Sequence, residues 1–382
     1  MIVARSLEDA GAPLNITLYE AHSSLRTPVV SAQGTHAQRR IVYCSVETQH
    51  GRGFGELATV EQPSWGDPST NETVSYLIAT AIPRLLEASK ARGGGALASY
   101  LVGPLLGGSR IGNAAASLIE MALLDAELRC SSMNLASWLG VEHPSVRRGA
   151  TIGGASIAEL EVAAYRALEA GAQRLRAKVD PERAFASGAA LRNMAGDQIA
   201  VQLDANGSFD LSGSSIEILR SLEALDIACL EQPLIGADLA AMAQLHSLIS
   251  IPLCLDETVA SLRTITDVAR YGAANAVCIK PVRFGGVRGA VAAIEQANAG
   301  HLSCFIGGMF ESGLGRSLIQ ALAGLPSVDM VSDTAPADTY LEQDPCALTP
   351  SASGEPLLWS HLGVGPWPDE AQLTPIAVFS PG

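Results

Sequence analysis

Between residues 174 and 286 lie five short apolar runs that each reach a charged residue: RLRAKVDP (174–181), VQLDANG (201–207), CLEQPL (229–234), PLCLDET (252–258) and VCIKPVRFGG (277–286). The charged residues are Lys178, Asp204, Glu231, Asp256 and Lys280. They follow one another at steps of 26, 27, 25 and 24 residues. A strand-like run repeated at this period is typical of alternating strands and helices.

The same alternation extends on both sides of this segment. Strands are predicted near residues 148–152, 174–179, 200–204, 227–231, 252–256, 276–280, 302–306 and 327–332. Amphipathic helices are predicted between them, for example over 156–170, 214–225 and 262–271. Eight such units favour a modified TIM (β/α) barrel over residues 126–354. The alternative, an open doubly wound sheet, needs a glycine-rich phosphate loop after its first strand, and none is visible.

Residues 1–125 have a different pattern, which predicts an α+β capping domain. Residues 16–20 and 40–48 alternate like strands, and helical spacing of apolar residues follows within 73–86 and 114–128. The polar stretch around residues 23–38 is expected to be a loop of the kind that often covers a site. The irregular tail, residues 355–382, is expected to pack back on this domain.

Composition describes an ordered, acidic, globular protein. Of 382 residues, 48% are apolar and 17% charged, and the net charge of −14 argues against nucleic acid and anionic membranes as partners. Neither a membrane span nor a signal peptide is recognisable. The seven cysteines show no CxxC spacing, and those in apolar runs are expected to be small buried hydrophobes. These features predict a reduced, cytoplasmic protein and leave its oligomeric state open, a homo-oligomer included.

The carboxyl ends of barrel strands meet at one mouth, so the five charged residues are expected to share one site. Asp204, Glu231 and Asp256 would repel one another there unless a cation neutralises them. Three carboxylates suit a hard ion, which predicts Mg²⁺ before Zn²⁺, with Mn²⁺ as a substitute. Asn206 is expected to hydrogen-bond a ligand or brace the loop.

Two other motifs are rejected. A calcium loop starting at Asp204 would need Gly and Glu where Phe209 and Ser215 stand. The glycines at positions 51, 53 and 55 resemble a dinucleotide loop, but no helix start follows directly and the third glycine has the wrong spacing.

Lys178 and Lys280 lie on opposite sides of the predicted metal site and indicate the reaction type. A cation on a substrate carboxylate makes its α-proton more acidic by stabilising the enediolate that forms. A lysine near that cation has a lowered pKa and can act as the base. Arg176, two residues before Lys178 on the same face, stays charged and is assigned a charge-tuning role. Arg283 is either a tuning group for Lys280 or an ordinary loop ion pair.

At these residues the sequence resembles the enolase superfamily, in which a lysine base beside Mg²⁺ is a known combination. Within it, the muconate-lactonizing-enzyme subgroup has a KxK motif that corresponds to Arg176-Ala177-Lys178, with arginine in place of the first lysine. The resemblance implies Lys178 and Lys280 as catalytic groups and the three strand-end carboxylates as metal ligands. No histidine falls at a predicted strand end, which argues against the mandelate-racemase subgroup.

Finer features resemble the o-succinylbenzoate synthase and N-acylamino-acid racemase family. They are KPVRFGG (280–286), GGMFESGLGR (307–316) and SDT (332–334). The region of Asp333 lacks a clear DxD, which argues against dipeptide epimerases. The resemblance implies that the substrate lies near Gly307, Gly308, Met309 and Glu311.

The leading hypothesis is an o-succinylbenzoate synthase-like lyase of menaquinone synthesis that acts on a small carboxylate. Lys178 would remove the α-proton and protonate the departing hydroxide, while Lys280 stabilises the enediolate. The alternative is an N-succinyl or N-acyl amino-acid racemase, in which both lysines act on opposite faces. A non-catalytic barrel scaffold predicts missing ligands, yet all five strand-end residues are present.

Overall fold

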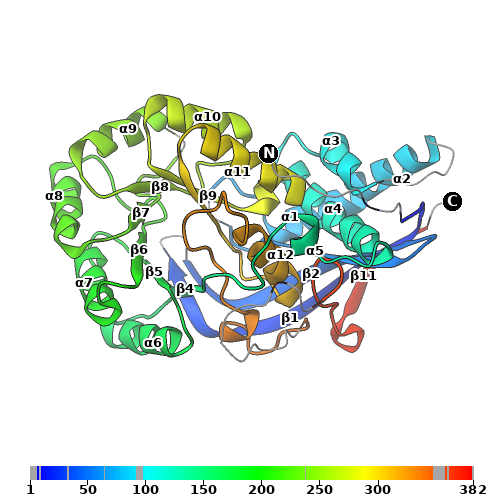
Figure 1. The fold of residues 1–382 in the computed structure, drawn as a ribbon, viewed down its shortest axis with the longest axis horizontal. Helices are drawn as coiled ribbons and strands as arrows, with labels where there is room; N and C mark the ends of the chain where they lie inside the picture. The colour runs from blue at the N-terminus through cyan, green and yellow to red at the C-terminus, as the bar shows by residue number, and fades with distance from the viewer. Residues whose placement is uncertain are drawn as a thin grey trace.

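The computed structural model describes residues 7, 10–31, 34–63, 65–91, 98–236, 238–346, 358 and 361–380. A four-stranded antiparallel sheet has the order β11 (Thr374–Phe379), β1 (Pro13–Ser31), β2 (Gly34–Thr48) and β3 (Arg52–Leu57). A seven-stranded parallel sheet forms the barrel. The fold is therefore the predicted modified barrel with an antiparallel capping sheet. Figure 1 shows the outer helices of the barrel forming an arc around its strands.

The barrel strands and helices lie close to the predicted places. In chain order the strands are β4 (Gly149–Ile152), β5 (Arg174–Lys178), β6 (Ala200–Asp204), β7 (Cys229–Glu231), β8 (Leu253–Leu255), β9 (Ala276–Ile279) and β10 (Ser303–Ile306). The helices are α6 (Ile157–Glu169), α7 (Ala184–Ala195), α8 (Gly213–Ser221), α9 (Leu239–Leu248), α10 (Leu262–Tyr271), α11 (Val287–Ala299) and α12 (Gly313–Ala323). Local signals set their ends: Ser156 and Ser261 accept N-cap hydrogen bonds, and Gly272 ends α10 in the left-handed conformation.

The predicted eighth strand at residues 327–332 is wrong. An irregular segment, residues 330–335, bridges β10 and β4 instead, with Asp333 N donating to Ile306 O at 2.9 Å and Ala335 N to Gly149 O at 3.1 Å. The hydroxyl of Thr334 accepts from Gly149 N at 3.0 Å. Side-chain hydroxyls thus share with the backbone the hydrogen bonds that a strand would make through its backbone alone, which the apolar pattern does not reveal.

The stretch around residues 23–38, expected to be a loop, is mostly the extended end of a long β-hairpin. Strands β1 and β2 stay paired out to Val29 and His36, with a register irregularity on the way. The hairpin is held against the barrel side, since Arg26 N donates to Tyr340 O at 2.9 Å. The polar, turn-rich composition of this stretch had suggested an irregular backbone. Its backbone groups instead form hydrogen bonds within the hairpin and with the barrel side.

Helix α4 (Arg110–Cys130) lies between the capping sheet and the barrel and is buried along most of its length. Glu120 Oε2 accepts from Val287 N, at the start of α11, at 2.5 Å. Asp125 Oδ2 accepts from Phe54 N in β3 at 3.1 Å and from Trp367 Nε1 at 2.7 Å. Two buried carboxylates of one helix therefore connect sheet, tail and barrel. The other capping helices are α1 (Thr70–Tyr76), α2 (Ile82–Ala91) and α3 (Val102–Leu106), whereas the buried side chains of the short helix α5 (Leu135–Trp138) belong to the core cluster of the barrel strands.

The tail is not wholly irregular, because β11 pairs antiparallel with β1, Ile16 facing Phe379. Its apolar residues, such as Ile376, pack on the core of the capping sheet. The division into residues 1–125 with 355–382 and residues 126–354 stays a prediction, since α4 runs across the boundary at 125. In the described part of the chain, no helix has the length and apolarity that crossing a membrane requires.

Gly53 and Gly55, the glycines rejected as a nucleotide loop, allow β3 to lie directly on α4. A Cβ on Gly55 would collide with Leu118 O and would lie 2.9 Å from Ala122 N. A Cβ on Gly53 would meet Ala126 N at 2.5 Å. The contacting atoms belong to helix backbone and cannot move aside separately. These two glycines therefore allow the close approach of strand β3 to helix α4.

We expect Gly55→Ala to destabilise the protein by about 1–3 kcal/mol, because the added methyl overpacks this contact. Gly213→Ala is the matched control, since a Cβ there meets no atom within 4 Å. Denaturant unfolding followed by circular dichroism would measure both. Equal unfolding midpoints for the two variants would contradict the close-approach explanation.

Candidate active site

The carboxyl ends of β5, β6, β8 and β9 open into a cavity of about 590 Å³. Its lining includes Lys178, Asp204, Asn206, Asp256 and Lys280. The capping region supplies His36, Val60 and Gln62 to the same lining. Glu231, at the end of β7, is fully buried. The structure thus brings the five strand-end residues of the sequence motif together, while their roles stay predictions.

Each lysine of the site is paired with a carboxylate on a neighbouring strand. Lys178 Nζ donates to Asp204 Oδ2 at 3.0 Å and to Asn206 Oδ1 at 2.5 Å. Lys280 Nζ donates to Asp256 Oδ2 at 2.7 Å. In the sheet, β6, β7 and β8 separate the strands that carry the two lysines. The two amines therefore face the cavity from different sides.

Arg176 binds two carboxylates below the mouth. Its Nη1 lies 3.0 Å and 3.1 Å from the two oxygens of Glu231, and its Nη2 lies 2.8 Å from Asp333 Oδ2. Gln202 Nε2 donates to Glu231 Oε2 at 2.5 Å. Gln202 was not among the predicted residues, although its position two residues before Asp204 on β6 places it on the same strand face. No sequence signal connects Asp333 with Arg176.

Arg283 connects a predicted metal ligand to the capping region. Its Nη1 donates to Asp256 Oδ1 at 2.6 Å, and its Nη2 donates to Asp67 Oδ2 at 2.7 Å. Asp67 also accepts from Arg110 Nη1, at the start of α4, at 2.8 Å. Sequence reasoning missed Asp67, because it lies outside the repeating units and matches no motif. Arg283 is thus a buried ion-pair partner of Asp256.

The predicted residues after β10 line or support the cavity wall. Gly308 and Met309 line it, and Gly308 N donates to Asp333 Oδ2 at 3.0 Å. Glu311 accepts from Met309 N at 2.6 Å and pairs with Arg316 Nη2 at 2.8 Å. A Cβ on Gly307 would collide with the Cys278 sulfur and lie 3.0 Å from Lys280 Cε, so glycine keeps this wall of the cavity clear of both side chains. Through its contacts with Met309 N and Arg316, Glu311 holds the loop after β10 in place.

Burial and charge act against each other at the carboxylates. Burial raises the pKa of Glu231 to about 8; Asp204 and Asp256 add to this rise, and Arg176 opposes it. Burial also disfavours charge on Asp256, but Lys280 and Arg283 outweigh it and hold its pKa well below the ordinary value. Burial alone would lower the pKa of Lys280, yet Asp256 raises it above its usual range.

The family profile described as "Enolase C-terminal domain-like" matches residues 159–353, about half of the chain. An N-succinylamino acid racemase from Amycolatopsis is 31% identical over 330 residues, which cover 86% of this chain and 88% of that protein. The chain belongs to the enolase superfamily. Within it, the chain falls in the muconate-lactonizing-enzyme subgroup and is an enzyme, a lyase or a racemase.

Two further relatives of this enolase-superfamily enzyme cover most of its length. The o-succinylbenzoate synthase of Bacillus subtilis is 25% identical over 335 residues, which cover 86% of each chain. The crystal structure of the muconate lactonizing enzyme of Pseudomonas fluorescens, complexed with muconolactone, superposes with a TM-score of 0.82. It is 21% identical and covers 95% of this chain and 98% of its own.

Enolase-superfamily members use a divalent metal ion, and the donor set at the barrel mouth fits one. Asp204 and Asp256 both raise the pKa of Glu231, which places three repelling carboxylates around one region. Oε2 of Glu257, next to Asp256, is buried without a hydrogen-bond partner in the described residues. A cation would relieve the mutual repulsion of these carboxylates. Asp204, Glu231 and Asp256 are the residues we expect to hold it.

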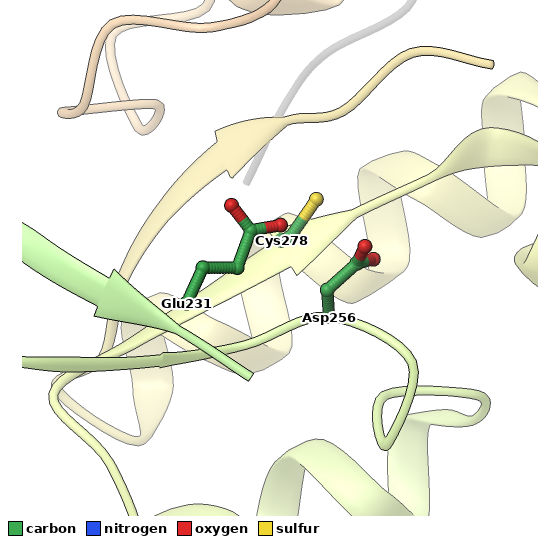
Figure 2. Close-up of side chains that lie close together, drawn as sticks. All are labelled: Glu231, Asp256 and Cys278. Atoms are coloured by element: carbon green, nitrogen blue, oxygen red, sulfur yellow. The ribbon is translucent and has the colours of Figure 1, made fainter. Parts of the chain in front are cut away.

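Oxygen atoms of Glu231 and Asp256 lie within 4.8 Å of each other and of the Cys278 sulfur (Figure 2). Asp204 is not part of this close group among the described residues. Its Oδ2 faces Lys178, and its Oδ1 accepts from Asn206 N at 3.1 Å. Asn206 also donates from its amide to Glu257 Oε1 at 2.9 Å. Asn206 therefore braces the loop, as one of its two expected roles.

We expect Glu231→Gln to weaken Mn²⁺ binding by at least about tenfold, because the loss of even an outer partner of a metal ligand costs about 10- to 100-fold in affinity. The matched control is Glu217→Gln on the exposed face of α8. Titration of Mn²⁺ followed by electron paramagnetic resonance measures the free ion directly. Unchanged affinity in Glu231→Gln would exclude this carboxylate as a ligand.

Proposed function

We propose that the enzyme is a divalent-metal-dependent racemase of N-succinyl or other N-acyl amino acids. The observation that carries the proposal is the presence of two lysines, Lys178 and Lys280, that line one cavity from well-separated strands. Racemisation needs one proton-transfer group on each face of the α-carbon. The 31% identity to an N-succinylamino acid racemase along 86% of the chain supports the same choice.

This order reverses the one reached from the sequence, where the synthase led and the racemase was the alternative. The synthase resembles the chain at 25% identity, against 31% for the racemase, over similar lengths. The motifs used in the sequence, such as GGMFESGLGR, are common to both activities in the family they resemble. They therefore did not separate a lyase from a racemase.

In the proposed reaction, the neutral amine of one lysine takes the α-proton from one face of the substrate. The ammonium of the other lysine gives a proton to the opposite face, so the configuration inverts and the enzyme's proton inventory is unchanged. A bound Mg²⁺ would stabilise the negative charge that develops on the substrate carboxylate. Asp256 and Asp204 hold the amines in place at 2.7 Å and 3.0 Å. Arg283 fixes Asp256 from the side away from Lys280.

The second candidate is the o-succinylbenzoate synthase of menaquinone synthesis, favoured by the similarity to the Bacillus subtilis synthase. In that reaction Lys178 alone would move protons: it removes the α-proton and returns it to the departing hydroxide as water. Lys280 would stay cationic beside the developing charge. Both candidates begin with the same α-proton abstraction, and they differ in what Lys280 does.

Single lysine substitutions separate the faces of the reaction. We expect Lys280→Ala to abolish α-proton exchange with D₂O from one enantiomer of an N-succinyl amino acid and to retain exchange from the other. Lys178→Ala should show the opposite preference. Each lost exchange should fall by about 10²- to 10⁴-fold, the usual contribution of a positioned acid–base group. Proton NMR of each pure enantiomer measures both rates.

The control for these variants is Lys90→Ala, because the sequence contains three lysines and Lys90 is exposed on α2. It should exchange both enantiomers like the wild type. A wild type that exchanges neither enantiomer of a panel of N-succinyl and N-acetyl amino acids would overturn the racemase proposal.

The synthase has its own test. With Mg²⁺ present, conversion of the succinylated cyclohexadiene carboxylate to o-succinylbenzoate should require Lys178, and Lys280→Arg should retain part of it because arginine keeps the charge. Ultraviolet absorption of the aromatic product measures the rate. If the wild type leaves this substrate unchanged while racemising N-succinyl amino acids, the synthase is excluded.

A further inference from the structure

The thiol of Cys278 lies beside the carboxylates of the proposed metal site. Cys278 is on β9, two residues before Lys280, so both side chains point to the barrel interior. Its sulfur and oxygen atoms of Glu231 and Asp256 all lie within 4.8 Å of one another. Figure 2 shows the three side chains close together. Glu231 ends β7, Asp256 directly follows β8, and Cys278 lies within β9. As expected, Cys278 is buried in an apolar cluster, with Cys254 and Phe305 among its members. Its sulfur also lies beside the two carboxylates.

This thiol is fully buried, yet it has no hydrogen-bond partner among the described residues. Two other buried thiols reach an oxygen: that of Cys304 lies 3.5 Å from Ser327 O, and that of Cys346 lies 3.5 Å from Tyr43 Oη. The space beside Cys278 is preserved by Gly307, since a Cβ on that glycine would collide with the sulfur. An unpartnered polar atom therefore faces two carboxylates in a tightly enclosed position.

The chemistry of this group differs from that of three carboxylates. Thiolate sulfur favours soft or borderline ions, whereas carboxylate oxygen suits Mg²⁺ and Mn²⁺. Two ligand atoms at about 2.0–2.3 Å from a shared Zn²⁺ are at most about 4.6 Å apart, so a small inward movement would bring the donors together. Asp204 is held away from the group by Lys178 at 3.0 Å. An ion bound by Glu231 and Asp256 could therefore take its third protein ligand from either the Asp204 oxygen or the Cys278 sulfur.

We propose that Cys278 Sγ, with Glu231 and Asp256, forms a binding site for thiophilic divalent cations such as Zn²⁺, Co²⁺ and Cd²⁺. The inference rests on the metal site of the proposed function but assigns it a second mode of binding. The metal–sulfur bond replaces the S–H bond, and the thiol proton is released to water. An ion in this position lies next to Asp256, which also binds Lys280 at 2.7 Å. Such ions should therefore compete with Mg²⁺ and interfere with the lysine.

Cobalt absorption tests this directly. Co²⁺ added to the full-length protein without other metals should give an intense thiolate-to-cobalt charge-transfer band in the near ultraviolet, together with weaker visible bands. Cys278→Ser should lose the charge-transfer band and keep visible bands from the remaining oxygen ligands. Cys254→Ser is the matched control: Cys254 is also a fully buried barrel thiol, on β8, and its sulfur faces Leu255 O at 3.9 Å. This control should keep the charge-transfer band.

Affinity gives a second measurement. Loss of a group outside the first ligand shell costs about 10- to 100-fold in metal affinity, so loss of the thiolate should weaken Cd²⁺ binding by at least about tenfold. Mn²⁺ affinity should change far less in the same variant, because manganese takes oxygen ligands. Cys278→Ala provides a second variant without a hydroxyl. Thermal unfolding of each variant verifies that it is folded under the titration conditions.

The outcomes separate this inference from the proposed function. Cobalt bound without a charge-transfer band in the wild type, or with the band intact in Cys278→Ser, overturns the thiolate site and leaves the oxygen site standing. Equal losses of Cd²⁺ and Mn²⁺ affinity would also overturn it. If neither Co²⁺ nor Mn²⁺ binds the wild type, the thiolate site and the proposed metal site fail together.

Discussion

The pairing of buried charges at the barrel mouth is the constraint on which the site depends. A buried charge is costly unless an opposite charge and hydrogen bonds compensate for it. Each predicted ligand has such a partner: Asp204 with Lys178, Glu231 with Arg176, and Asp256 with Lys280. These pairs join neighbouring or nearby strands, so they require the strand ends to stay within hydrogen-bonding distance. The helices and the apolar core around the barrel hold them there.

The same charge pairing makes the capping region part of the site. Asp67 reaches Asp256 through Arg283, and Arg39 on β2 donates to Phe310 O at 3.0 Å in the loop after β10. Phe310 has a positive φ of 58°, which is strained for a bulky residue and needs such support. The capping sheet thereby fixes the shape of the cavity wall. The cavity of this enzyme therefore depends on a segment far from the barrel in sequence.

The sequence allowed the barrel strands and the five strand-end residues to be predicted because each strand is a short apolar run with a charge at its end. The signal is local and repeated. Asp67, and the pairing of Asp333 with Arg176, could not be found, since the partners lie 216 and 157 residues apart and no periodicity connects them. The eighth strand was predicted wrongly because side-chain hydroxyls of Ser332 and Thr334 supply part of the pairing with β10 and β4. The hairpin around residues 23–38 was missed because its pairing partner and barrel contacts are not encoded in its own composition.

The alternation of side chains along the strands explains why sulfur ligands lie on only one side of Glu231. Residues two positions before the mouth form a layer directly beneath it. On β5 and β6 this layer is Arg176 and Gln202, which both bind Glu231. On β7, β8 and β9 it consists of the buried thiols of Cys229, Cys254 and Cys278. Polar support thus reaches Glu231 from one side, while the other side offers only sulfur. Among the described residues, Cys278 is the thiol that groups with both carboxylates, so oxygen and sulfur ligands lie together at this point.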